Sequence, residues 1–81
     1  MEPQELQIES IYVPVKRRAT LDSKTVEALA EDILQAGQKV PIQVRVDGDR
    51  FVLIEGLHRL EACKALGEQT ISAVIVRARL H

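Results

Sequence analysis

The stretch LIEGLHRLEACKAL, residues 53–66, decides how the chain divides into structural elements. A short apolar run ends at Glu55 and Gly56, and residues with helical spacing follow at once, so this segment predicts a strand that passes directly into a helix. The first turn of that helix carries His58 and Arg59. A helix N-terminus is already positive, and each exposed cation there costs roughly 0.3–1 kcal/mol. The two charges therefore require either a carboxylate partner or an anionic ligand.

The helical projection of this segment gives Arg59 an unusual place. At about 100° per residue, Arg59 falls inside the arc of apolar residues, His58 falls on its border, and Leu57 points away from it. The apolar arc consists of Leu60, Ala62, Cys63 and Leu66. We therefore expect Arg59 to face the sheet and Leu57 to face outward. A cation directed toward a core must be paired, because burying an unpaired charge is very costly.

Two interpretations of Arg59 stay open at this point. In the first, Arg59 forms a structural ion pair with Glu55 or Asp22. In the second, its partner is a phosphate, since a strand followed by Gly56 and a helix N-terminus presents free N–H groups to anions. Arg59 would then bind phosphate oxygens bidentately, and His58 would donate a hydrogen bond, more strongly when protonated. A single glycine before a helix is a weak motif, so the residues alone favour the structural ion pair over the phosphate.

The only basic run is KRRAT, residues 16–20, which we expect in a connecting loop. A short charge run usually marks a solvated loop. Alternatively, Lys16, Arg17 and Arg18 form the second half of the same anion site. This requires both predicted helices to lie side by side and point the same way, so that their N-termini open on one pocket.

Composition limits the class of protein. The 81 residues are 46% hydrophobic with only two aromatic residues, Tyr12 and Phe51, which predicts one small domain with an aliphatic core. The net charge of −1 gives no global attraction to nucleic acid or membrane, so any anion site must be local. The single cysteine, Cys63, excludes an internal disulfide. No apolar run reaches the ~18 residues of a membrane span, and the polar N-terminus does not resemble a signal peptide. We therefore expect a soluble cytoplasmic domain.

The first half of the chain predicts one strand and one helix. Residues 1–6 are expected to be a flexible N-terminus and residues 7–81 the folded domain. LQIESIYV, residues 6–13, predicts a strand that Pro14 ends. A helix capped by Asp22 or Ser23 follows and stops at Gly37. Its expected buried face comprises Val26, Leu29, Ala30, Ile33 and Leu34.

The second half predicts a hairpin, a helix and a strand. IQVRV (42–46) and RFVLI (50–54) are joined by Asp-Gly-Asp at 47–49, a strong hairpin signal. The helix covers about 56–66, and TISAVIVRARL (70–80) is rich in β-branched residues. The order β-α-β-β-α-β predicts an α+β domain with helices packed on a mainly antiparallel sheet.

Two motifs carry a family resemblance. Val13-Pro14-Val15-Lys16-Arg17-Arg18, followed by Asp22, is similar to Asn-Pro-x-Gln-Pro-Arg followed by an aspartate, with matches at the proline, the last arginine and the aspartate. Gly56-Leu57-His58-Arg59-Leu60-Glu61-Ala62 is similar to Gly-Glu-Arg-Arg-x-Arg-Ala, with matches at the glycine, the second arginine and the alanine. On these motifs and the order of elements, residues 8–78 resemble the N-terminal domain of ParB-type partition proteins, in the ParB/sulfiredoxin superfamily.

The resemblance implies a function. In ParB proteins these motifs form a CTP-phosphate site, so it implies a nucleotide-phosphate pocket here, with CTP or ATP and accompanying magnesium as ligands and no catalytic or metal-ligating residue. It implies a switch or accessory module in chromosome or plasmid partition or in transcription-related machinery. The implied phosphate-binding residues are Lys16, Arg18, Gly56, His58 and Arg59.

Sulfiredoxin activity is not expected. Sulfiredoxins carry Gly-Gly-Cys-His-Arg at this place, whereas this chain has Leu57 where they have the nucleophilic cysteine. Leucine has no thiolate, so that sulfur chemistry cannot run here. Cys63 is expected to be a packed core thiol.

Other functions stay open. A protein-protein interaction domain that has lost nucleotide binding is favoured by the departures at Leu57 and Glu61, with a protein partner or a second copy bound instead. An NTPase or metal-dependent nuclease would need converging carboxylates, and Glu55, Glu61 and Asp22 are the only candidates. No helix-turn-helix follows the last predicted strand, so specific DNA binding by this chain alone is not expected. Weak, salt-sensitive phosphate contacts are expected at most, through Lys16, Arg17, Arg18, Arg77 and Arg79.

Overall fold

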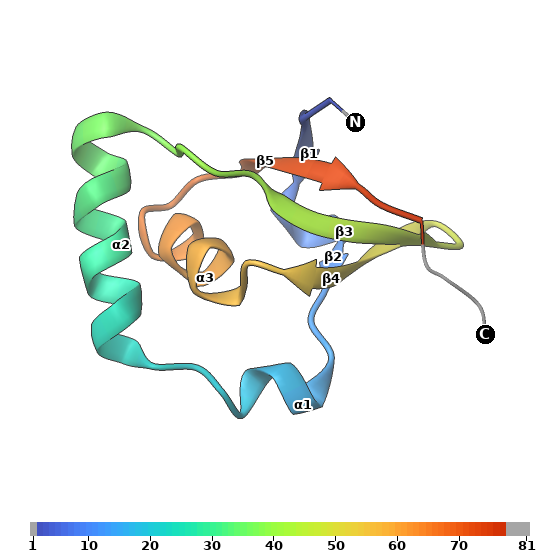
Figure 1. Cartoon of the computed structure of the whole chain (residues 1–81), viewed down its shortest axis with the longest axis horizontal. Coiled ribbons are helices and arrows are strands. Elements are labelled where there is room, and N and C mark those ends of the chain that lie inside the picture. The colour runs from blue at the N-terminus through green and yellow to red at the C-terminus, as the bar shows by residue number, and fades with distance from the viewer. Residues whose placement is uncertain (1, 78–81) are drawn as a thin grey trace.

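The computed structural model describes residues 2–77 and contains five strands and three α-helices. The elements are β1 (Gln4–Gln7), a 3-10 turn η1 (Ile8–Ser10), β2 (Ile11–Tyr12), α1 (Val15–Arg18), α2 (Ser23–Ala36), β3 (Ile42–Asp47), β4 (Arg50–Glu55), α3 (Leu57–Ala65) and β5 (Thr70–Ile75). The strands form one sheet in the order β1-β5-β3-β4-β2. Helix α3 lies between this sheet and α2 (Figure 1). The predicted α+β class is confirmed.

The sheet is mixed rather than mainly antiparallel. The pairs β1/β5 and β3/β4 are antiparallel, whereas β2/β4 and β3/β5 are parallel. Of these four pairings, the sequence predicted only the β3/β4 hairpin, whose strands are adjacent in the chain. The other three pairings join strands that are distant in sequence, and such contacts leave no local pattern.

The structure confirms the predicted hairpin and the predicted long helix. Asp47 pairs with Arg50 across the turn, and the Arg50 Nε lies 3.0 Å from the Asp47 Oδ2. Helix α2 begins after Asp22 and ends before Gly37, whose N–H donates to the Ile33 carbonyl at 2.7 Å. The KRRAT segment, expected as a loop, instead begins inside the short helix α1.

The N-terminal prediction was wrong in two ways. Residues 4–7 are not part of a flexible tail, because they form β1 on β5 and bury Leu6. The segment 6–13 is not one strand, because η1 interrupts it and β2 pairs at the opposite edge of the sheet. The buried positions explain the interruption: Ile8 and Ile11 are three residues apart, whereas a continuous strand requires even spacing. At the other end, the predicted last strand stops at Ile75, and residues 78–80 lie outside the described part of the chain.

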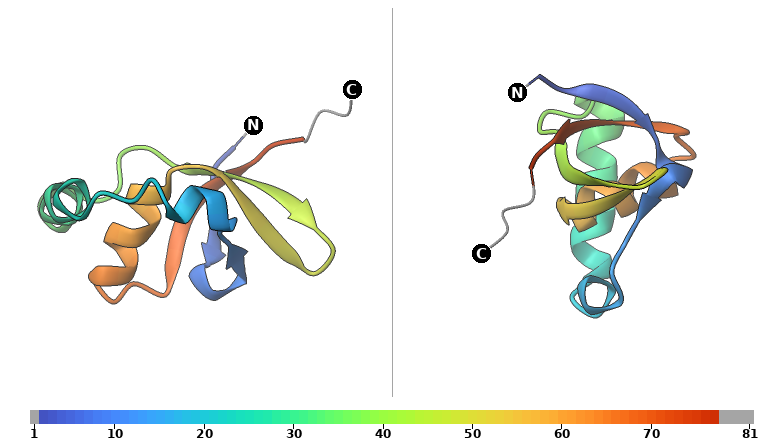
Figure 2. Two further views of the ribbon diagram at one scale, coloured as in Figure 1. Left: turned by 90° about the horizontal axis from the view of Figure 1, so that it is seen from below. Right: turned by 90° about the vertical axis from the view of Figure 1, so that its right-hand side faces the viewer.

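The core is aliphatic, as predicted, and α3 is its centre. Helix α3 buries side chains on several sides because it is enclosed by the sheet on one side and by α2 on the other (Figures 1 and 2). This overturns the expectation that Leu57 faces outward, since Leu57 is only 5% exposed. The helical projection failed because it assumes a single covered face. The largest fully buried side chains are Ile42, Val44, Leu53, Leu60 and Ile71.

Helix α2 is covered much less than its sequence predicts. None of its residues is fully buried, and Leu34, assigned to the buried face, is 73% exposed. Val26, Leu29, Ala30 and Ile33 are half-buried against α3. The apolar stripe of α2 is therefore wider than the surface that α3 offers it. Along residues 2–77, no helix is both long and apolar enough to cross a membrane.

Burial makes a prediction about Cys63. Its side chain is 3% exposed, and burial raises the pKa of the thiol, with Glu68 and Glu5 adding to the effect. Both the access and the thiolate fraction needed for disulfide exchange are therefore low. We expect the native protein to react with a chromogenic aromatic disulfide far more slowly than the urea-unfolded protein. Equal rates of thiol modification with and without urea would contradict this packing.

Candidate functional site

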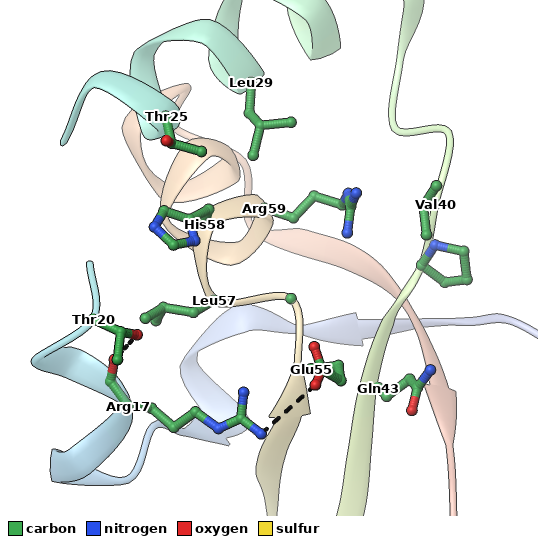
Figure 3. Close-up of a pocket in the computed structure, with 12 residues that line it drawn as sticks. Arg17, Thr20, Thr25, Leu29, Val40, Gln43, Glu55, Leu57, His58 and Arg59 are labelled. Atoms are coloured by element: carbon green, nitrogen blue, oxygen red, sulfur yellow. Dashed lines mark hydrogen bonds and ion pairs between the residues drawn. The ribbon is translucent and has the colours of Figure 1, made fainter. Parts of the chain in front are cut away.

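A cavity of about 610 Å³ lies at the N-terminal end of α3. Three parts of the chain enclose it: α1 and the start of α2, the first turn of α3, and the adjoining ends of β3 and β4 (Figure 3). Its volume falls within the range of small-molecule sites. It is lined by Arg17, Thr20, Thr25, Leu29, Val40, Pro41, Gln43, Glu55, Gly56, Leu57, His58 and Arg59.

The N-terminus of α3 faces this cavity without a side-chain cap. Gly56 occupies the N-cap position and no side chain bonds to the first turn. The first bond of the helix runs from the Leu60 N–H to the Gly56 carbonyl at 2.9 Å, so the N–H groups of Leu57, His58 and Arg59 have no partner within the helix. Such uncapped N–H groups give the cavity wall a partial positive charge.

Gly56 is required by the fold itself. Its φ of +107° is a conformation that other residues rarely adopt. A Cβ at this position would also lie 2.6 Å from the Ile42 Cγ2 and 3.0 Å from the Ile42 Cβ. The glycine thus lets β4 turn into α3 while touching the fully buried Ile42.

The N-terminus of α2 is already occupied. The Asp22 carboxylate accepts hydrogen bonds from the Lys24 N–H at 3.3 Å and from the Thr25 hydroxyl at 2.7 Å. These two bonds, the one from Thr25 being the stronger cause, hold the pKa of Asp22 below its ordinary value of 3.8. The two helices also do not point the same way, because α2 is seen end-on where α3 is seen from the side (Figure 2). The expectation that both helix N-termini offer N–H groups to one anion is therefore wrong.

His58 connects the two helices. Its Nε2 accepts a hydrogen bond from the Asp22 backbone N–H at 3.0 Å, which requires a neutral ring with the proton on Nδ1. We predicted that His58 donates to a phosphate, and the ring retains only Nδ1 for that. A second proton, on Nε2, would break the bond from the Asp22 N–H. While that bond is kept, His58 therefore offers a ligand only one donor, Nδ1.

The basic residues divide between the cavity and the surface. Arg59 is half-buried and extends from α3 toward Val40 (Figure 3), and within residues 2–77 no carboxylate lies within ion-pair distance of it. Arg17 also lines the cavity, whereas Lys16 and Arg18 are exposed and do not. Sequence reasoning thus chose Lys16 and Arg18 in α1, and the cavity contains the residue between them. Helical spacing would have separated Arg17 from its neighbours had α1 been predicted.

The carboxylates near the site have other partners. Glu55 lies 4.0 Å from the Arg17 guanidinium, and Glu61 lies 3.2 Å from the Lys64 ammonium, away from the cavity. The structural ion pair expected between Arg59 and Glu55 or Asp22 is therefore not formed. In the described part of the chain, no three His, Cys, Asp or Glu side chains converge as metal ligands would.

Comparison with known proteins places the chain in a family. A family model described as the ParB N-terminal domain matches residues 1–80. The chain belongs to this family. Among curated proteins, this ParB N-terminal domain is 39% identical over 62 residues to a probable chromosome-partitioning protein ParB of Campylobacter jejuni, covering 76% of the chain and 22% of the relative. It is 40% identical over 72 residues to the chloroplastic/mitochondrial sulfiredoxin of Arabidopsis thaliana, covering 88% of the chain and 57% of the relative. The domain thus spans only part of each.

Solved structures agree with this assignment. The crystal structure of sulfiredoxin from Arabidopsis thaliana matches with a TM-score of 0.86 and 33% identity, covering 96% of this chain and 88% of that one. A C-terminally truncated ParB from Caulobacter crescentus, complexed with CTP-γ-S, matches with a TM-score of 0.84 and 23% identity, covering 98% and 46%. A free serine kinase in complex with ADP matches with a TM-score of 0.81 and 19% identity, covering 94% and 31%. At these last two identities the likeness concerns the fold alone.

Gly56→Ala tests the contact with Ile42. We expect a loss of about 2–5 kcal/mol in the free energy of unfolding, combining about 1–2 kcal/mol for the left-handed backbone with about 1–3 kcal/mol for the overpacked contact. Gly67→Ala is the matched control, because Gly67 has a φ of +77° with no atom within 4 Å of the added Cβ. Urea denaturation measures both variants. Equal losses for the two would show that Ile42 adds no constraint.

Asp22 gives a pH-dependent stability. Because its folded pKa is depressed, its contribution is full above its ordinary value of 3.8 and is lost as the pH falls through the lower folded value. We expect Asp22→Ala to lower the thermal midpoint at pH 6, and the difference from wild type to narrow as the pH falls below 3.8. Circular dichroism melts across this range measure it. A difference that does not change with pH would show that the charge of the Asp22 carboxylate does not stabilise α2.

Proposed function

We propose that this ParB N-terminal domain binds a nucleoside triphosphate, CTP or ATP, through its phosphates at the N-terminus of α3. It acts as a switch or accessory module in DNA partition or transcription-related machinery. The proposal depends mainly on the position of Arg59, which is half-buried without an ion-pair partner in the described structure. A half-buried guanidinium beside three unpaired helix N–H groups, with no described carboxylate to neutralise it, is suited to an anion.

The phosphate contacts follow from the geometry. Arg59 approaches from the Val40 side of the cavity and Arg17 from the α1 side, so an anion between them would meet two guanidinium groups and the backbone of Gly56, with the Glu55 carboxylate beside Arg17 (Figure 3). Binding would separate Arg17 from Glu55, which at 4.0 Å is a loose and exposed pair of little energetic weight. His58 adds one Nδ1 donor. Magnesium would enter bound to the phosphates, since no described cluster of ligands holds it.

Two departures from the family motif do not oppose this function. Leu57 is only 5% exposed, so it forms part of the cavity wall and offers no exposed contact to a protein partner. Glu61 pairs with Lys64 and does not line the cavity, so it does not repel an anion there. Neither residue therefore favours a domain that has lost nucleotide binding. Known relatives support the proposal: a structurally similar ParB is complexed with CTP-γ-S and a serine kinase with ADP.

Calorimetric titration with CTP and ATP, each with and without magnesium, tests the proposal. We expect one nucleotide to bind, and Arg59→Ala to weaken it by about 10-fold to 100-fold, because a charged hydrogen bond contributes about 1.5–3 kcal/mol. If the folded domain binds neither nucleotide, the proposal is wrong. If Arg59→Ala binds the nucleotide as tightly as wild type, the nucleotide binds at another site.

The arginines of α1 give a matched pair for the same titration. We expect Arg17→Ala to weaken binding several-fold and Arg18→Ala to leave it within about twofold, since only Arg17 lines the cavity. Both substitutions remove the same charge from the same short helix, so long-range electrostatics affect them alike. If Arg18→Ala weakens binding more than Arg17→Ala does, the phosphate ligands are Arg18 and Lys16, as the family motif implies.

A further inference from the structure

A second concave surface follows the outer side of the contact between α2 and α3. It consists of two adjoining open hollows, of about 350 and 460 Å³, that share Glu27. We call it the α2–α3 groove. Its lining residues are Leu21, Ser23, Val26, Glu27, Ala30, Glu31, Leu34, Glu61, Lys64, Ala65 and Leu66.

The groove lies on the opposite side of α2 from the nucleotide cavity. At about 100° per residue, Thr25 and Leu29, which line the cavity, fall within about 40° of each other, whereas Ala30 and Leu34 fall about 140° and 180° away from Thr25. Ile33, between these two sets, packs against the core. The two surfaces share no lining residue. A ligand in the groove therefore makes contacts distinct from those of the nucleotide.

The floor of the groove is apolar and unusually exposed. Leu34 is 73% exposed and Leu21 is 43% exposed, while Val26, Ala30 and Leu66 are half-buried. An isolated exposed leucine is ordinary, but here exposed and half-buried apolar residues continue along the whole length of α2. From Ser23 to Leu34 the row extends about 17 Å at ~1.5 Å per residue, which is about three turns of a helix.

The groove also carries acidic side chains. Glu27 lines both hollows and Glu31 lines one of them, and in the described structure neither has a cation within ion-pair distance. The only cation in the groove, Lys64, is engaged by Glu61 at 3.2 Å. Two unpaired carboxylates beside an apolar row complement a helix with an apolar stripe flanked by lysine or arginine.

We propose that the α2–α3 groove binds a basic amphipathic helix of a partner protein, about three turns long. Its apolar stripe packs on Leu34, Ala30 and Leu66, and its flanking cations meet Glu27 and Glu31. The groove does not depend on the nucleotide proposal, because none of its residues lines that cavity. The partner's helix would cover the apolar side chains of α2 that α3 leaves exposed.

Fluorescence anisotropy with two synthetic peptides tests the groove. Each is a stapled helix of about three turns with leucines on one face; one has lysines beside the leucines and the other has glutamates. We expect the folded domain to bind the basic peptide and not the acidic one. Leu34→Ser should weaken binding by about tenfold. Val15→Ser is the matched control, because Val15 is 72% exposed but lies on α1, outside the groove.

A charge reversal makes the test stricter. The double variant Glu27→Lys and Glu31→Lys should lose the basic peptide and gain the acidic one, whereas the exposed pair Glu2→Lys and Glu9→Lys should change neither. Failure of wild type to prefer the basic peptide, or an unchanged preference after the charge reversal, overturns the proposal. A dimer in sedimentation velocity that Leu34→Ser dissociates also overturns it, because the occupant would then be a second copy of the chain.

Discussion

The close approach of Gly56 to Ile42 is the constraint on which this domain depends. Strand β4 must become helix α3 within one residue, and it does so with a φ of +107° while its backbone rests on a side chain that is 0% exposed. Ile42 begins the central strand β3, so the glycine fixes where α3 starts relative to the middle of the sheet. The first turn of α3, with its uncapped N–H groups, is thereby held at the cavity.

This constraint changes what the glycine can be taken to mean. A glycine before a helix is often read as room for a phosphate, but here the backbone conformation and the contact with Ile42 account for it fully. The case for an anion rests instead on Arg59, which is half-buried with no described carboxylate partner, and on the N–H groups that no side chain caps. Those two features have no structural explanation within the described chain, whereas the glycine has one.

The strongest local signals in the sequence predicted their structures, whereas weaker alternation and signals that depend on tertiary surroundings did not. The Asp-Gly hairpin and the Asp22 cap were predicted because their physics is confined to a few neighbouring residues. Leu57 was misplaced because a helical projection cannot know that α3 is covered on two sides. Arg18 was chosen over Arg17 because a motif gives order along the chain, whereas the one-turn helix α1 decides which of the two faces the cavity. Gly56, His58 and Arg59 were brought together as expected.

The position of α2 links the two surfaces. Having no fully buried side chain, α2 is held largely by α3 and by polar contacts at its two ends. At its start, the Asp22 N–H bonds to His58; after its end, the Gln38 side chain both donates to and accepts from the Ser72 backbone at 2.9 Å. Each of these polar contacts contributes about 1 kcal/mol, and the apolar packing of α2 is mainly on α3 rather than on the sheet. A ligand in the cavity and a partner helix in the groove would both contact α2, on different sides. If either one shifts α2, the affinities at the two surfaces are coupled, and the coupling is reciprocal.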